Sequence, residues 1–195
     1  MKLKRSFYNR DTIIVAKELL GKTLVHITKE GLLSGIITET EAYIGPWDRA
    51  AHTYGGKMTK RTEPVFGPPG YAYIYFIYGL YYCLNVVTRE AGIPECVLIR
   101  GLKPQEGIDE ISQNRFGIVY DKLSSLQKRN LCDGPSKLCM ALDIGKDDNK
   151  KDLMGDTLFI TDENMPEQIK IEEGKRIGID YAKEARDYLW RFSIR

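Results

Sequence analysis

Two glutamates stand two positions apart in the segment ETEAYIGPWDRAAH, residues 39–52, and a tyrosine and a histidine follow them. Side chains two apart lie on one face of a β-strand, so Glu39, Glu41 and Tyr43 are expected together at the end of a strand. A carboxylate there would face a cleft and act as a general base, or stabilise positive charge on a substrate. The alternatives are an exposed polar strand face for the two acids and a structural role for His52.

Six of the twelve tyrosines fall within residues 71–82. Tyr71, Tyr73 and Tyr75 occupy alternate positions, which places their rings on one face of a strand. Tyr78 is followed by a glycine, which favours a tight turn and puts the Tyr78 ring at the tip of a hairpin. Rings on such a hairpin could stack on flat nucleobases. The alternative is a packed strand that uses tyrosine for its β-propensity, and this stretch alone leaves both open.

Strands and short helices are expected to hold these residues in place. A helix begins after Asp11, a good N-cap, and Gly21 can end it. Residues 44–69 predict a long loop, and long ordered loops are usually functional. The order of elements predicts an α+β fold in a single domain, residues 1–195, built on a curved antiparallel β-sheet with flanking helices and a protruding β-hairpin. Further helices are expected at residues 105–114, 124–131 and 135–142, and strands at 23–28, 32–43, 71–77, 81–88, 96–102, 157–160, 169–172 and 189–194.

The composition is that of an ordinary globular protein. No apolar run approaches the length of a membrane span, and the first ten residues lack the apolar core of a signal peptide, so we expect a cytoplasmic protein. The net charge is only +2, so affinity for nucleic acid would need cations gathered on one face. Residues 146–152 mix both signs and are expected to form a solvated loop. The candidate cations are Lys57, Lys60, Arg61, Lys137, Lys146, Lys150, Lys151 and Arg176.

The four cysteines show no metal-binding spacing. No two of them form a CxxC pair, and the chain has only two histidines, which argues against a structural zinc site. In a cytoplasmic protein we expect reduced and mostly buried thiols. We therefore expect no metal and no cofactor.

Four segments in a fixed order resemble one known family. They are ETEAYIGPWDRAAH (39–52), YIYFIYGLYYCLN (73–85), CVLIRGLKPQEG (96–107) and LCDGPSKLCMAL (131–142). Together they are similar to the alkyladenine (3-methyladenine) DNA glycosylase family, and the resemblance covers nearly the whole chain. Four matching segments in the same order identify the family far more specifically than any one segment does. The chain resembles a compact member that consists of the catalytic domain alone.

The resemblance implies a catalytic role for three residues. Glu41 matches the general base that activates water against C1′ of the deoxyribose. Arg100 matches the arginine that positions this carboxylate and the water. The main-chain carbonyl of Ile177 matches another group that holds the water.

The same resemblance assigns residues to base recognition and to DNA binding. Tyr43, His52 and Tyr75 match the residues that sandwich the extruded base, and Tyr73 would orient His52 through a hydrogen bond. Asn85 matches the residue that opposes the 2-amino group of undamaged guanine. The DNA-binding positions are Tyr78, which matches the wedge that fills the gap left in the helix, and Lys137 and Lys146, which resemble phosphate contacts.

These matches imply a monofunctional DNA glycosylase of base-excision repair. It would flip alkylated or deaminated purines (3-methyladenine, 7-methylguanine, hypoxanthine or ethenoadenine) out of double-stranded DNA and hydrolyse the N-glycosidic bond. A cationic alkylpurine leaves readily, whereas a neutral lesion needs protonation, and the sequence names no acid for this. No lysine occupies a nucleophile position in the four segments, so we expect no lyase step. The resemblance also implies a monomer, because the family acts alone on DNA, and the protein would be nucleoid-associated when bound to DNA.

Two other hypotheses remain at this point. One is a module that binds damaged or bent DNA and has lost catalysis, against which only Glu41 and Arg100 argue. The other is a metal-dependent hydrolase, which the absence of ligand clusters disfavours.

Overall fold

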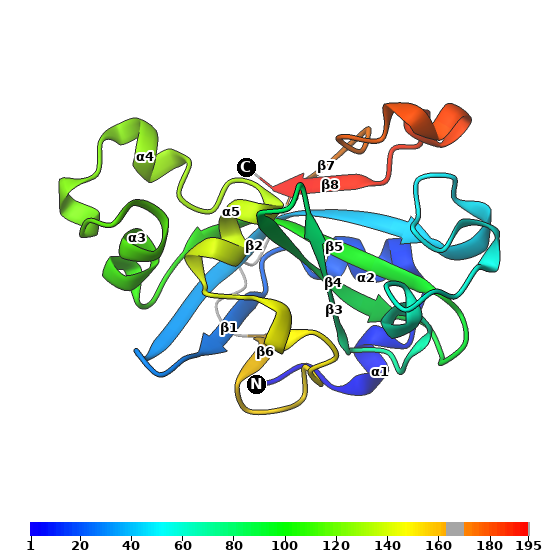
Figure 1. The fold of residues 1–195 in the computed structure, drawn as a ribbon, viewed down its shortest axis with the longest axis horizontal. Coiled ribbons are helices and arrows are strands. Elements are labelled where there is room, and N and C mark those ends of the chain that lie inside the picture. Colours follow the sequence, from blue (N-terminus) through cyan, green and yellow to red (C-terminus); the bar gives the residue numbers. More distant parts are fainter. Residues whose placement is uncertain (163–169, 195) are drawn as a thin grey trace.

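An eight-stranded antiparallel β-sheet forms the centre of the computed structural model, which describes residues 1–162 and 170–194. The strand order is β3-β4-β5-β2-β1-β6, while β8 pairs with both β2 and β7 (Figure 1). This confirms the predicted α+β class, the curved antiparallel sheet and the protruding hairpin. The strands are β1 Thr23–Ile27, β2 Leu32–Ile44, β3 Ala72–Ile77, β4 Tyr81–Thr88, β5 Glu95–Pro104, β6 Leu158–Thr161, β7 Ile171–Gly174 and β8 Arg191–Ile194.

Short helices surround this sheet, and local sequence signals explain several of their ends. The Asp11 side chain accepts hydrogen bonds from the N–H groups of Ile13 and Ile14, and Gly21 follows the helix with a φ of 82°. Ser124 and Gln127 form a reciprocal capping box at another helix start. The α-helices are α1 Arg5–Tyr8, α2 Thr12–Glu18, α3 Ile108–Phe116, α4 Ser125–Arg129 and α5 Pro135–Ala141. The 3₁₀ turns are η1 Gly45–Trp47, η2 Tyr54–Gly56, η3 Glu63–Phe66, η4 Tyr120–Lys122, η5 Lys146–Asp148 and η6 Asp180–Asp187.

Strand β2 causes the curl of the sheet because it changes partner along its length. Residues 32–36 pair with β1, whereas residues 39–41 pair with β8 on the same edge. The register with β5 shifts on both sides of Glu39, which is a β-bulge. A bulge bends its strand and increases the local twist, so the second half of β2 turns away from β1 and toward β8.

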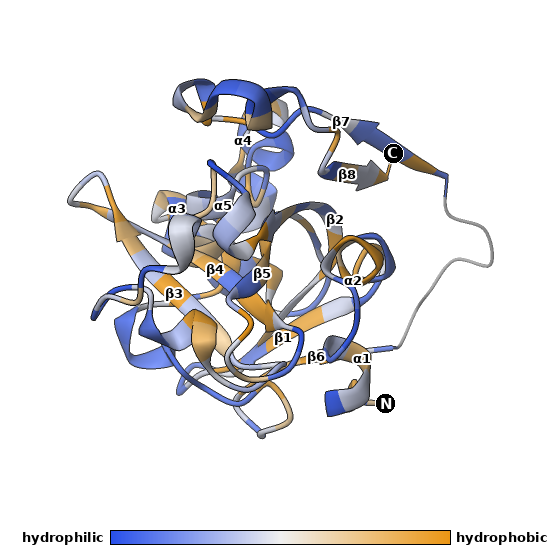
Figure 2. Ribbon diagram, turned by 90° about the vertical axis from the view of Figure 1, so that its right-hand side faces the viewer, coloured by the Kyte–Doolittle hydropathy of each residue, from blue (hydrophilic) through white to orange (hydrophobic). Residues whose placement is uncertain are grey.

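The two faces of the sheet have different roles. Alternate residues such as Ile74, Val86 and Ile99 enter the main core together with residues of α2 and α5. Figure 2 shows the central strands as predominantly hydrophobic and much of the outlying loop and helix surface as hydrophilic. The opposite face carries a smaller cluster that includes Tyr73 and Val87. This second face is the one that a ligand can reach, as described below.

Several predicted boundaries differ from the structure. The helix expected at 105–114 begins only at Ile108, because the N–H groups of residues 105 and 106 bond to Ser34 and extend the pairing with β2. The terminal strand expected from residue 189 begins at Arg191. The strand expected at 169–172 is found as β7, although Ile169 lies outside the described residues.

The mixed-charge run at 146–152 is not simply the solvated loop that we expected. Asp148 is buried, its side chain accepts a hydrogen bond from Lys151 Nζ at 2.6 Å, and it lies 3.3 Å from His26 Nε2. The other ring nitrogen of His26 donates to the carbonyl of Leu142 at 2.7 Å. The opposite charges therefore neutralise one another inside the fold and attach the η5 turn to β1.

Candidate active site

A cavity of about 390 Å³ opens on the second face of the sheet. Its walls come from strands β2 to β5, the loop after β2, the start of α5 and residues 177–181. Segments that are far apart in the sequence therefore enclose one space. Of the residues predicted for catalysis and recognition, Tyr43, His52, Tyr75, Tyr78, Asn85, Arg100 and Ile177 line this cavity.

The register of the sheet brings the central residues into one row. Tyr73 of β3 is opposite Asn85 of β4, Asn85 is opposite Leu98 of β5, and Leu98 is opposite Glu41 of β2. Directly paired residues on antiparallel strands point to the same face. The row therefore extends without interruption from Tyr73, in the tyrosine-rich hairpin, to Glu41.

Glu41 lies behind the cavity wall rather than facing a cleft, which differs from our expectation. Its side chain is completely buried. The Tyr43 hydroxyl donates to Glu41 Oε2 at 2.7 Å, and the Ile177 N–H donates to Oε1 at 2.8 Å. Arg100 Nε lies 3.5 Å from the same Oε1. Because all three of these neighbours line the cavity, the carboxylate is one layer of groups away from it.

Arg100 is shared between two carboxylates. Its Nε lies 3.4 Å from Glu39 Oε1 and 3.5 Å from Glu41 Oε1, and it makes no hydrogen bond to any described residue. Arg191 donates to the same oxygen of Glu39 at 2.9 Å and so competes for it. The prediction that Glu39 and Glu41 lie on one side of the strand is confirmed by their common neighbour.

The surroundings of Glu41 act on its pKa in opposite directions. Burial raises the pKa of this carboxyl above its ordinary value, while Arg100, the Ile177 N–H and the Tyr43 hydroxyl hold back part of the rise. Burial, together with the charge of Glu41, raises the pKa of Tyr43 as well, so its hydroxyl stays protonated and remains a donor. The result is a desolvated carboxylate whose negative charge is stabilised by three fixed groups.

Aromatic side chains form the walls on the hairpin side. His52 Nδ1 and the Tyr73 hydroxyl are 3.0 Å apart, which is the contact expected for these two residues. The His52 ring meets Tyr75 edge-on, with centroids 4.7 Å apart and planes at 82°. Burial and the nearby Arg61 lower the pKa of His52 to about 4, so its ring is neutral near pH 7. A neutral ring next to tyrosines can pack against a flat ligand without adding charge.

Asn85 is held in one orientation at the floor of the cavity. Its Nδ2 donates to the carbonyl of Tyr73 at 3.1 Å, and its Oδ1 accepts a weak hydrogen bond from Cys96 Sγ at 3.8 Å. The side chain is almost completely buried. A ligand in the cavity therefore meets a side-chain amide whose orientation is already fixed by the protein.

Tyr78 is at the tip of the hairpin, as predicted. The residue is 83% exposed, and its φ of 54° is in the left-handed region that side chains other than glycine rarely adopt. The N–H of Leu80 bonds to the carbonyl of Ile77 and closes the turn. A large ring is thus presented to solvent beside the cavity that it lines.

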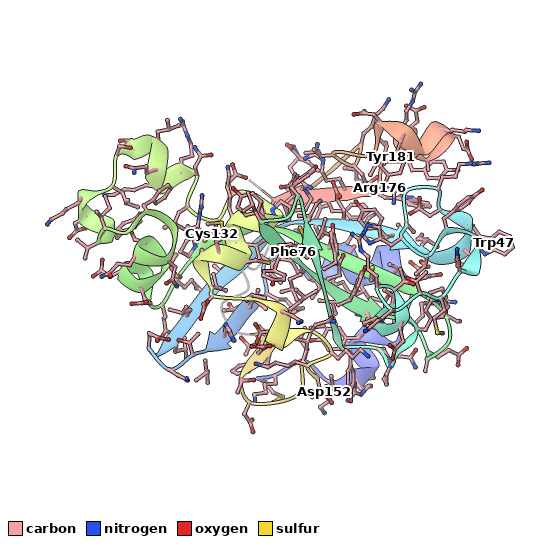
Figure 3. All side chains as sticks on the ribbon, viewed as in Figure 1. Trp47, Phe76, Cys132, Asp152, Arg176 and Tyr181 are labelled. Carbon is pink, nitrogen blue, oxygen red and sulfur yellow. The ribbon has the colours of Figure 1, made fainter. Side chains whose placement is uncertain are left out.

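The predicted cations have different surroundings. Lys137 is half-buried in the first turn of α5 and donates to Asn130 Oδ1 at 2.9 Å, and the preceding Pro135 and Ser136 line the cavity. Lys146 is exposed on the η5 turn. Arg176, expected as a surface cation, is instead buried, because Asp48 neutralises it inside the protein. In the view of Figure 3 the labels of Arg176 and Tyr181 lie near one another, next to the ribbon of the η6 turn.

Sequence reasoning missed the importance of Asp48 and Tyr181. Asp48 forms the buried pair with Arg176, and Tyr181 lines the cavity with a ring that is 68% exposed. For Asp48, the available signal was its position just after the Gly-Pro turn in the first of the four segments. We find no sequence signal for Tyr181.

The described residues contain no group of three or more His, Cys, Asp and Glu side chains arranged to hold a metal ion. All four cysteines are buried free thiols, as expected. Within residues 1–162 and 170–194, no helix has both the length and the apolar character needed to span a bilayer.

Comparison with known proteins gives matches over the whole chain. The family model described as "Methylpurine-DNA glycosylase (MPG)" matches residues 6–195. A Clostridium acetobutylicum protein named "Putative 3-methyladenine DNA glycosylase" is 56% identical over 195 residues, which cover 100% of this chain and 95% of the relative. Proteins with the same name from Clostridium perfringens (strain SM101) and Desulfitobacterium hafniense are each 52% identical. Those matches cover 100% and 99% of this chain, and 96% and 95% of the relatives.

Proposed function

Because this chain belongs to the methylpurine-DNA glycosylase family and is an enzyme that hydrolyses N-glycosyl bonds in DNA, we propose a specific reaction for it. The enzyme flips alkylated or deaminated purines, of the 3-methyladenine, 7-methylguanine, hypoxanthine and ethenoadenine type, out of duplex DNA. It hydrolyses the bond to the deoxyribose and leaves an abasic site. Residues 1–195 act as one catalytic domain, as a monomer that is nucleoid-associated when bound to DNA.

Glu41 is the general base in this proposal. Breaking the N-glycosidic bond builds positive charge on the sugar, so a carboxylate at C1′ both stabilises this charge and takes a proton from the attacking water. The single observation that carries the proposal is the convergence of three cavity-lining groups on the Glu41 carboxylate, from Tyr43, Arg100 and Ile177. A carboxylate held in this way at the wall of a cavity is suited to act as a general base.

The reacting water binds where Arg100 and Ile177 flank Glu41. Arg100 Nε has no hydrogen bond to a described residue, so it can donate to a water that Glu41 also contacts. The N–H of Ile177 donates to Glu41, and its carbonyl, to which the family resemblance assigns this role, helps to hold the water. Ile177 is 53% exposed and lines the cavity, so this position is accessible from the side of the DNA.

The extruded base is sandwiched by the rings of Tyr43, His52 and Tyr75, which all line the cavity. Electron-rich rings attract an electron-poor or cationic alkylpurine, which favours damaged bases over normal ones. The main-chain amide of His52 contacts the edge of the base. The preset amide of Asn85 opposes the 2-amino group of an undamaged guanine.

Contacts outside the cavity hold the distorted duplex. Tyr78 fills the gap that the extruded base leaves, and recovers part of the few kcal/mol that unstacking costs. Its exposure at the hairpin tip supports this role. Lys137 and Lys146 contact phosphates.

Release of free base from defined oligonucleotides tests the proposal. The protein is incubated with duplexes that each carry one hypoxanthine, ethenoadenine or methylated purine, in the presence of a metal chelator. We expect free base and an abasic strand. Tight binding without release would indicate a binding module, and activity lost to the chelator would indicate a metal-dependent hydrolase. A DNA adduct trapped by borohydride would show a lyase step and contradict the monofunctional mechanism.

A further inference from the structure

We propose that the buried ion pair between Asp48 and Arg176 holds Tyr43 and Ile177 in position against Glu41. We call these last three residues the catalytic corner. This inference rests on the proposed function of Glu41, and it concerns residues that do not touch the substrate themselves. The two side chains are completely buried. They connect three walls of the cavity that come from different parts of the chain.

The guanidinium of Arg176 is held in one plane. Its Nη2 donates to Asp48 Oδ1 at 2.8 Å, and its Nη1 donates to Oδ2, which is a bidentate pair. Nη1 also donates to the Ala42 carbonyl at 2.9 Å, and Nη2 to the Ala185 carbonyl at 3.2 Å. Because each of the two terminal nitrogens makes two hydrogen bonds, the group cannot rotate without breaking several of them.

This fixed plane supports the ring of Tyr43. The central carbon of the Arg176 guanidinium lies 4.8 Å from the centroid of Tyr43 and 5.0 Å from that of Trp190. The hydroxyl of the same tyrosine donates to Glu41. A shift of the guanidinium would therefore move the base-stacking wall and one of the three donors to the catalytic carboxylate together.

The backbone carries a second link to the catalytic corner. Arg176 directly precedes Ile177, whose N–H donates to Glu41 at 2.8 Å. The following Gly178 has a φ of 77°, so the chain turns sharply there. Ile179, Ala182 and Ala185 then pack in a small apolar cluster. Anchoring Arg176 therefore sets where the Ile177 N–H points.

Asp48 provides the third link, to the loop that carries His52. Its Oδ1 accepts from the N–H of Ala50 at 2.9 Å, and its Oδ2 accepts from the N–H of Ile44 at 3.2 Å. Ala50 lines the cavity and belongs to the same apolar cluster as residues 179–185. One carboxylate thus orders the start of this loop and pairs with the arginine.

Stability alone does not account for this pair. Removing two charges from water is costly, and well-packed apolar residues are often as stable as a buried ion pair. Apolar residues cannot fix the orientation of polar neighbours. The planar guanidinium can do so, because it binds a carboxylate and two carbonyls and stacks on a ring at the same time. The pair therefore fits a role in geometry.

Paired neutral substitutions test the inference. We compare Asp48→Asn, Arg176→Gln and the double variant with wild type by thermal unfolding and by single-turnover base release at a range of enzyme concentrations. Each single variant leaves a buried group unpaired and should lose stability. The double variant leaves no buried charge and should regain stability, yet its saturating rate should stay on the order of 100-fold low. The enzyme concentration that gives half the saturating rate should change by less than about threefold.

A control and a second variant keep the test decisive. Leu158→Ala creates a cavity in β6, at the opposite end of the strand path from β3, and should lower stability while the saturating rate stays unchanged. Arg176→Lys keeps the charge but cannot form the bidentate contact, so it should fold and show the same low rate if the double variant does not fold.

The structure of the double variant gives a readout that does not depend on activity. We expect the Tyr43 hydroxyl and the Ile177 N–H to lose their hydrogen bonds to Glu41. A double variant with both hydrogen bonds intact, or with a wild-type saturating rate, would overturn the inference. Wild-type protein that releases no base would refute the proposed function instead. In that case, the two hydrogen bonds to Glu41 in the double variant would still show whether the Asp48–Arg176 pair positions Tyr43 and Ile177.

Discussion

Two clusters of buried charge differ in how completely their polar atoms are used. In one cluster an arginine lies beside the cavity between two carboxylates, and its Nε makes no hydrogen bond to a described residue. In the other, a carboxylate accepts hydrogen bonds from a lysine and from the N–H of Gly145, and it faces a histidine. No residue of the second cluster lines the cavity. We call them the pocket cluster, which consists of Glu39, Glu41 and Arg100, and the η5 cluster, which consists of His26, Asp148 and Lys151.

The comparison shows that burial of charge does not by itself indicate an active site. The η5 cluster has its main bonding capacity satisfied within the protein, so it can hold a turn against a strand but has little left for a ligand. In the pocket cluster, Arg100 Nε is an unused donor next to the cavity, and burial raises the pKa of the Glu41 carboxyl. Unused hydrogen-bonding capacity next to a cavity is therefore the more specific sign of function.

Among the variants that compare the two clusters, Arg100→Met should have the largest effect. This change removes the cation that favours the ionised form of Glu41, so the pKa of Glu41 should rise further. Base release at pH 7 should fall on the order of 100-fold or more, and the acid limb of the pH–rate profile should move to higher pH. The matched control is Arg191→Met, which removes a hydrogen bond to Glu39 and one to the Lys175 carbonyl but none to Glu41. An Arg100→Met enzyme with an unshifted pH profile would remove the distinction between the two clusters.

His26→Gln should affect stability and leave catalysis unchanged. Burial alone would lower the pKa of His26, but hydrogen bonds with Asp148 and Leu142 overcome this and raise it above the ordinary value of 6.5. Protonated His26 therefore stabilises the fold below pH 6.5, and this contribution is lost as the pH rises through the raised value.

Chemical unfolding of His26→Gln and wild type at several pH values measures this difference. We expect a loss of about 1–3 kcal/mol for His26→Gln at low pH, and a smaller loss at high pH. The base-release rate per folded molecule should equal that of wild type. A slower rate would mean that the η5 cluster also serves the site.

Substitutions of Tyr78 separate DNA binding from chemistry. Tyr78→Ala and Tyr78→Gly both remove the ring, so each should weaken binding to a lesion duplex by about 1–3 kcal/mol. Only glycine relieves the positive φ, so Tyr78→Gly should also be more stable than Tyr78→Ala by up to about 1 kcal/mol. Equilibrium binding and thermal unfolding measure these two quantities. Unchanged binding in both variants would show that the tip does not enter the duplex.

Lys137→Ala should give the smallest effect. Loss of one phosphate contact should reduce the slope of log affinity against log salt by about 0.9, for any DNA sequence. Lys29→Ala, an exposed change in the turn between β1 and β2, is the control and should leave the slope unchanged. Equal slopes for wild type and Lys137→Ala would exclude this contact.

Local signals account for the parts of the structure that the sequence predicted well. The N-cap at Asp11, the period-two tyrosines and the turn after Tyr78 each depend on neighbouring residues, and all three are found as expected. The four segments that carry the family resemblance lie on the walls of a single cavity or next to it. Most of the residues that the resemblance named are therefore found around one common space.

Long-range packing decided the features that the sequence did not predict. Glu41 is buried because Ile177, 136 residues later in the chain, lies against it. Arg176 is buried because Asp48, 128 residues earlier, neutralises it. A lone arginine or aspartate carries no local sign of such a partner, so exposure was the natural expectation. The β-bulge at Glu39 is equally invisible, because a register shift depends on both strands.

Glu41→Gln is the sharpest test of the proposed mechanism, because it removes the base and keeps the shape of the side chain. The measurement is single-turnover release of hypoxanthine or a methylated purine from duplex DNA, together with binding of the same duplex. We predict that release falls by at least about 100-fold while binding stays within about threefold of wild type. Release at a rate close to that of wild type would rule out Glu41 as the general base, because the water would then be activated by another group.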